Sequence, residues 1–68
     1  MSNYHLELSD SEAKELWTAL SIRLIGMREE LVHTDDRAYR ASLKEATERL
    51  ELVYQRLEQI MSRPTPGG

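Results

Sequence analysis

Residues 39–60, YRASLKEATERLELVYQRLEQI, decide the fold of this chain. Their apolar residues recur at alternating spacings of four and three. This heptad pattern keeps one apolar stripe on one side of an α-helix. A matching pattern lies upstream, between residues 13 and 31. The predicted seam of the later segment is Tyr39, Leu43, Ala46, Leu50, Val53, Leu57 and Ile60, and that of the earlier segment is Ala13, Trp17, Leu20, Leu24, Met27 and Leu31.

The polar connection between the two segments is too short for a parallel crossover, so we expect the helices to run antiparallel. When residues whose numbers sum to about 70 are paired, every layer joins one position of each seam, as knobs-into-holes packing requires. Leu20 then faces Leu50, and Trp17 faces Val53. Large side chains tend to meet smaller ones in this register, which close packing favours. The predicted fold is therefore an all-α, antiparallel two-helix hairpin of the coiled-coil type.

Signals at the segment ends define the limits of the helices. Ser9 and Glu12 have the spacing of a capping box, which marks the start of the first helix. Thr34 or Asp35 is a candidate cap for the second helix. Pro64 and the residues after it stop that helix. The prediction is one domain over residues 1–62, with helices over 10–33 and 36–61, and a disordered tail over 63–68.

The segment before the first helix alternates between apolar and polar residues. Tyr4, Leu6 and Leu8 fall on one side of residues 3–8, which is the period of a short β-strand. No second strand is predicted within the chain. Two interpretations follow: the segment pairs with a second copy or with a partner's sheet edge, or it is an arm that lays Leu6 and Leu8 on the hairpin.

The chain is expected to self-associate. A hairpin of 68 residues without cysteine has one seam to bury and no disulfide to stabilise it. Three apolar residues of the first helix lie off its seam, and clustered exposed apolar residues indicate an interface. The predicted assembly is a homodimer that forms a four-helix bundle. The candidate interface residues are Ile22, Ile25, Val32, Tyr4, Leu6 and Leu8.

Gly26 interrupts the first helix, where glycine costs about 1 kcal/mol relative to alanine. It lies seven residues after Ala19, on the same side of the helix. One interpretation is a close helix–helix contact at this position. The other is a glycine that a well-packed helix tolerates.

Arginines flank the predicted seams. In the antiparallel register, Arg28 comes near Arg40, and Arg23 comes near Arg49, whereas a self-contained coiled coil places opposite charges there. Three interpretations are open: pairing with acids of the same helix or of a second copy, contact with an acidic protein, or contact with phosphates of RNA or of a small ligand. The candidate anion or partner contacts are Arg23, Arg28, Arg40, Arg49 and Arg56.

The sequence contains no recognisable catalytic or metal-binding motif, so we predict a protein that is not an enzyme and has no cofactor. Its two histidines, His5 and His33, fall at opposite ends of the predicted hairpin, whereas metal sites need several convergent ligands. No apolar run approaches the ~20 residues of a membrane span, and no signal peptide is visible. The expected location is the cytoplasm. The net charge of −3 argues against a general polyanion binder.

These patterns favour a small protein–protein interaction module, such as an adaptor, an inhibitor or an antitoxin-like regulator, that acts as a homo-oligomer. In size and helix layout the predicted hairpin resembles the small Rop-type dimers. That resemblance implies RNA binding, and the arginines that flank the seams independently suggest contact with phosphates. The alternative function is therefore the binding of RNA or of a phosphorylated small ligand. Phosphate contacts would make such binding strongly dependent on salt, which distinguishes it from an apolar protein interface.

Overall fold

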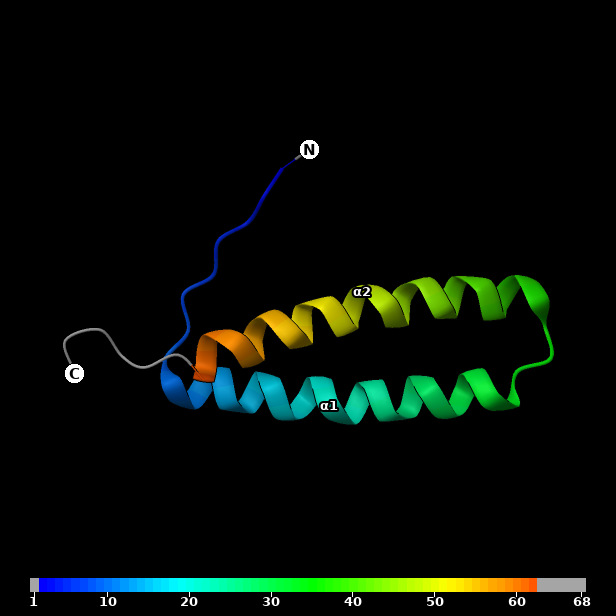
Figure 1. The fold of residues 1–68 in the computed structure, drawn as a ribbon, viewed down its shortest axis with the longest axis horizontal. Helices are drawn as coiled ribbons and strands as arrows, with labels where there is room; N and C mark the ends of the chain where they lie inside the picture. The colour runs from blue at the N-terminus through cyan, green and yellow to red at the C-terminus, as the bar shows by residue number, and fades with distance from the viewer. Residues whose placement is uncertain (1, 63–68) are drawn as a thin grey trace.

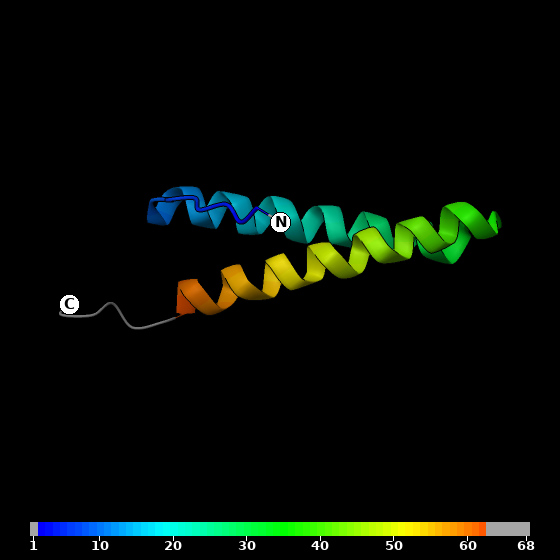
Figure 2. The ribbon, with the colours of Figure 1, turned by 90° about the horizontal axis from the view of Figure 1, so that it is seen from above.

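A computed structural model describes residues 2–62 and contains two helices. Helix α1 comprises Asp10–His33 and helix α2 comprises Arg37–Ser62. They run antiparallel, joined by residues 34–36 (Figure 1). Figure 2 shows that their axes are inclined, because the ribbons overlap near the connection and separate toward the other end. The predicted helix ranges of 10–33 and 36–61 differ from the observed ones by one residue at each end of α2. The predicted tail lies outside the described residues.

The start of α1 is held by the capping box expected from the sequence. The backbone N–H of Glu12 donates to Ser9 Oγ at 3.2 Å, and the backbone N–H of Ser9 donates to Glu12 Oε1 at 2.9 Å. Two N–H groups that have no partner inside the helix are thereby satisfied. The backbone N–H of Ser9, and after it the Ser9 side chain, favour the charged carboxylate and hold the pKa of Glu12 below its ordinary value of 4.5.

The start of α2 uses a different cap from the two candidates considered in the sequence. Asp36 Oδ1 accepts a hydrogen bond from the backbone N–H of Tyr39 at 3.0 Å. The carbonyl of Asp36 also accepts the first helical bond, from the N–H of Arg40 at 2.9 Å. Asp36 therefore occupies the capping position, directly before the first helical residue. The prediction of Thr34 or Asp35 was wrong because α2 begins at Arg37.

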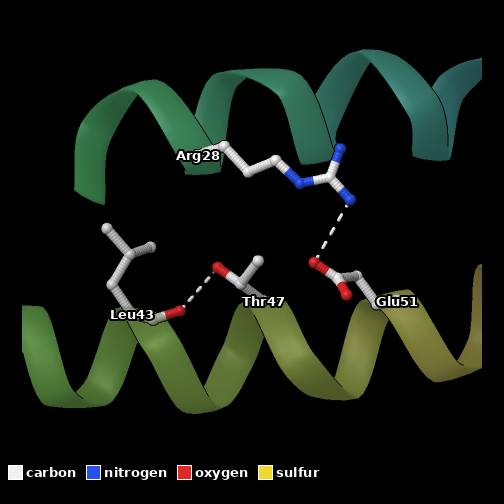
Figure 3. Close-up of polar contacts among 4 residues, drawn as sticks. All are labelled: Arg28, Leu43, Thr47 and Glu51. Atoms are coloured by element: carbon white, nitrogen blue, oxygen red, sulfur yellow. Dashed lines mark hydrogen bonds and ion pairs between the residues drawn. The ribbon is translucent and has the colours of Figure 1, made fainter. Parts of the chain in front are cut away.

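The core is small and lies between the two helices. Its buried apolar residues are Leu24, Met27, Leu43 and Leu57, with exposed fractions from 2% to 8%. One polar residue, Thr47, is buried with them at 4% exposure. Its hydroxyl donates to the carbonyl of Leu43 at 2.7 Å, so the buried oxygen is satisfied (Figure 3).

The seam of α1 agrees with its prediction, since all six of its residues are buried or half-buried. The seam of α2 agrees only in part. Leu43, Leu50 and Leu57 form the central line of its buried side as expected. The prediction was wrong for Tyr39, Val53 and Ile60, which are 47%, 47% and 63% exposed within one chain.

The place predicted for Val53 is taken by Tyr54. Its ring stacks on that of Trp17, with the ring centroids 5.7 Å apart and the planes at 17°. Tyr54 is half-buried, as is Trp17. The second buried line of α2 therefore runs through Thr47 and Tyr54, which lie four residues after Leu43 and Leu50. The prediction had placed this line three residues after them, at Ala46 and Val53.

The segment before α1 forms no strand in the described part of the chain. Residues 2–9 have no regular secondary structure, and Figure 1 shows them leading away from both helices. Tyr4 is 91% exposed and Leu6 is 75% exposed. The interpretation that an arm lays Leu6 on the hairpin was therefore wrong. Pairing of residues 3–8 with another chain stays a prediction.

Gly26 makes no close contact within the chain. A Cβ atom added there would meet no other heavy atom within 4 Å. The close-contact interpretation is therefore wrong for the single hairpin.

The hairpin is a single layer of helices. The chain as a whole extends over 51 × 28 × 15 Å with a radius of gyration of 15.0 Å, against about 11 Å for a compact domain of this length, and the segment before α1, which leads away from the helices, adds to these values (Figure 1). Domains are normally built from two or more packed layers around one core. Both broad faces of this layer are uncovered within the described residues.

Candidate interaction surfaces

One broad face of the hairpin carries an ion pair that joins the two helices. Nη2 of Arg28 on α1 donates to Oε1 of Glu51 on α2 at 3.2 Å, and Figure 3 shows the two side chains pointing toward each other. The side chains are 58% and 36% exposed, so water screens the attraction. We call this side of the hairpin the ion-pair face.

Two further arginines are held by groups of their own chain. The guanidinium of Arg40 donates to the carbonyl of Leu31 near the end of α1. Arg49 Nη2 lies 3.8 Å from Oε2 of Glu45, which is one turn earlier on α2. In each pair of arginines that the sequence brought together, at least one member thus has a partner in its own chain: both Arg28 and Arg40 do, and so does Arg49. Neither Arg23 nor Arg56 has an ion-pair partner within 4 Å among residues 2–62.

A polar contact closes the opposite face near the connection. The hydroxyl of Tyr39 donates to the carboxylate of Glu30. This hydrogen bond, together with the negative charge of Glu30, raises the pKa of Tyr39 above its ordinary value of 10.0. The positive charge of Arg23 acts in the other direction. These three residues make the connection end of this face polar.

The two faces can be assigned along α2 from helical geometry. At ~100° per residue, a residue three positions after a central leucine lies ~60° to one side of it, and a residue four positions after lies ~40° to the other. Glu51, directly after Leu50, lies ~100° toward the second side. Thr47 and Tyr54 therefore lie on the side of the ion pair, and Val53 lies on the opposite side.

The side of α2 away from the ion pair carries a continuous apolar line. Ala46 is half-buried in it, and the other three members are 47% to 63% exposed. On α1, Leu16 is half-buried and lies ~80° from Leu24 on the side away from Arg28. We call this side the apolar face; its residues are Leu16, Tyr39, Ala46, Val53 and Ile60.

The interface residues predicted on α1 form a separate surface. Ile22, Ile25 and Val32 are 66%, 56% and 74% exposed. From Leu24, Ile25 and Val32 lie ~80–100° toward the side of Arg28, and Ile22 lies farther out, on the back of the helix. The structure therefore brings them together with one another but not with Tyr4 and Leu6 or with the apolar face.

A groove opens between the helices at the free end, where α1 begins and α2 ends. It encloses ≈ 300 Å³ and is lined mostly by carbon, from Lys14, Trp17, Glu58, Met61 and Ser62. The indole Nε1 of Trp17 is buried and has no hydrogen-bond partner in the described part of the chain. Such an atom carries the full cost of its lost hydration.

The described residues offer no site for metal chemistry. Among residues 2–62, no three histidine, aspartate or glutamate side chains lie close enough to hold an ion. Neither described helix combines the length and the apolar character that crossing a bilayer demands.

Comparison with known proteins found no matching family model, no curated protein with significant sequence similarity and no solved structure with significant similarity.

Proposed function

We propose that this protein is a non-enzymatic interaction module that acts as a homo-oligomer, with further apolar surface left to bind another protein. The observation that carries the proposal is the shortage of buried apolar surface in one chain. The chain exposes 6185 Å², whereas a compact monomer of its mass exposes about 4,400 Å². Residues 2–9, which lead away from the helices, contribute to this difference, and the two helices add exposed aliphatic side chains, among them Ile22, Ile25, Val53 and Ile60. A standard interface buries about 800 Å² on each partner.

The arginines give less support to the alternative of an RNA or phosphate binder. Arg28, Arg40 and Arg49 already have partners in their own chain, so an anion would have to displace them. Two of the aromatic rings, Trp17 and Tyr54, stack on each other between the helices, which leaves them less available to stack on a base. An adaptor, inhibitor or regulator that acts through helix faces fits these contacts better.

Sedimentation velocity over a hundredfold range of concentration tests the proposal. We expect a mass of two chains or a small multiple at high concentration, and a thermal unfolding midpoint that rises with concentration, because association stabilises the folded state by mass action. A folded monomer at every concentration, with a midpoint that does not change, would remove self-association from the proposed function.

A further inference from the structure

We propose that the second copy packs on the free half of the apolar face, against Leu16, Val53 and Ile60, and that the ion-pair face stays outside. This inference rests on the proposed self-association and names the surface that performs it. It differs from the interface expected from the sequence, which used Ile22, Ile25 and Val32.

The first argument is the width of the apolar stripe on α2. A helix with one coiled-coil partner needs two apolar lines, whereas a helix in the core of a bundle needs a third beside them. Helix α2 has its central line at Leu43, Leu50 and Leu57, and a second line through Thr47 and Tyr54 that also faces α1. The third line, through Val53 and Ile60, has no partner within the described residues. Its presence indicates a second neighbour for α2.

The second argument is the contrast between the two broad faces. The ion-pair face contains Arg28 and Glu51, and covering it would bury charges at a cost that often exceeds their mutual attraction. The free half of the apolar face has no such pair at its centre. A second layer of helices therefore covers the apolar face at lower cost.

The third argument identifies the occupant as a copy of the same chain. In the free half, the outer edge of the apolar face is basic on α2, at Arg56, which lies ~100° from Leu57, and acidic on α1, at Glu12, which lies ~120° from Leu24 on the side away from Arg28. The stacking of Trp17 on Tyr54 places Arg56 level with the first turns of α1. A two-fold arrangement that lays α1 of one copy on α2 of the other brings these opposite charges together at both edges, which is self-complementary. It also gives Arg56 the partner that residues 2–62 of one chain do not supply.

Val53→Glu tests this assignment, and Leu52→Glu is its matched control. Leu52 is the preceding residue, is 55% exposed, and lies on the side of α2 that faces away from α1. Both variants exchange an exposed aliphatic side chain for the same charge. In sedimentation experiments we expect Val53→Glu to weaken dimerisation by at least about 30-fold, as the loss of an interface hot spot does. Leu52→Glu should dimerise as the unchanged chain does.

Cysteine labelling gives an answer even where the charged variant unfolds. The chain has no cysteine, so Val53→Cys and Leu52→Cys each introduce a single thiol. The thiol at position 53 should become protected from iodoacetamide as the protein concentration rises, while the thiol at position 52 stays reactive. Circular dichroism serves as the control and should show that both variants remain helical.

The outcomes separate this inference from the proposed function. A wild-type chain that is monomeric throughout overturns both. A dimer in which position 53 stays reactive, and which Ile25→Glu dissociates while Val53→Glu does not, overturns only the assignment of the face. In that case self-association stands, and the surface expected from the sequence is the correct one.

Discussion

The two halves of the hairpin carry the same heptad pattern but bury it to different extents. In the half next to the connection, Leu24, Met27, Leu43 and Thr47 are all at most 6% exposed. In the free half, where α1 begins and α2 ends, Leu57 is the one described residue that is buried. A heptad pattern therefore predicts which side of a helix is apolar, but not that a single partner helix covers that side.

Polar contacts explain part of the difference. Near the connection, the Tyr39–Glu30 hydrogen bond and the contact of Arg40 with Leu31 join the two helices at their edges. The free end has a groove instead, and the buried Nε1 of Trp17 beside it lacks a partner within residues 2–62. A second copy on the apolar face would cover Val53 and Ile60, the exposed aliphatic residues of that face in the less buried half.

The largest effect is expected from Leu24→Ala in the connection half. Leu24 is 2% exposed, and truncation of a buried leucine removes transfer free energy and leaves a cavity, at a cost of about 2–5 kcal/mol. Urea unfolding monitored by circular dichroism measures the loss. Leu52→Ala, at an exposed position, serves as the control and should change the free energy of unfolding by no more than about 0.5 kcal/mol. A loss below about 1 kcal/mol for Leu24→Ala would contradict the tight packing of this half.

Thr47→Val should make the same half more stable, by about 1 kcal/mol. The substitution replaces a buried hydroxyl with a methyl group of similar shape, which gains apolar burial. The carbonyl of Leu43 loses the hydroxyl donor but keeps its helical N–H donor. Thr18→Val is the matched control, because the hydroxyl of Thr18 makes the equivalent bond to Lys14 at 3.0 Å but is exposed. Equal effects at the two positions would show that burial of Thr47 is not the cause.

Trp17→Phe tests the free half, where we expect a change within about 1 kcal/mol. The smaller ring loses buried area, but it still stacks on Tyr54 and removes an N–H whose burial without a partner costs about 1–3 kcal/mol. Thermal and urea unfolding measure the balance. A loss as large as that of Leu24→Ala would mean that Nε1 donates a hydrogen bond in the native assembly.

The sequence predicted the features that depend on neighbouring residues. The capping box at Ser9, the range of α1 and the six residues of its seam follow from local spacing, which a single helix obeys on its own. The sequence failed at choices made between helices. On α2, residues three and four after each central leucine fit a heptad equally well, so the pattern alone does not distinguish Val53 from Tyr54. Thr47 was missed because a polar residue carries no hydrophobic signal, although its hydroxyl is satisfied within its own helix.

The smallest expected effects concern pH, and they differ in sign between the two ends. At the free end, the pKa of Glu12 is lower in the folded helix than in the unfolded chain, first because of the backbone hydrogen bond from Ser9. Its contribution to stability is therefore present above pH 4.5 and is lost as the pH falls through the lowered pKa. Backbone amide shifts of residues 10–13, followed by NMR during acid titration, should report fraying of the first turn. Glu12→Gln should make those shifts insensitive to pH over this range, because it removes the titrating carboxylate and keeps an oxygen that can accept from the Ser9 N–H.

At the connection end the dependence is reversed. The pKa of Tyr39 is raised above 10.0, chiefly by its hydrogen bond to Glu30, so its contribution is complete below pH 10.0 and is lost as the pH rises through the raised value. Acid should therefore loosen the free end first, and alkali should loosen the connection, where the amide shifts of residues 30–33 report it. Tyr39→Phe is the control, because it removes the titrating hydroxyl and keeps the ring. If the alkaline change persists in Tyr39→Phe, another group causes it, and the Tyr39–Glu30 contact does not distinguish the two halves in solution.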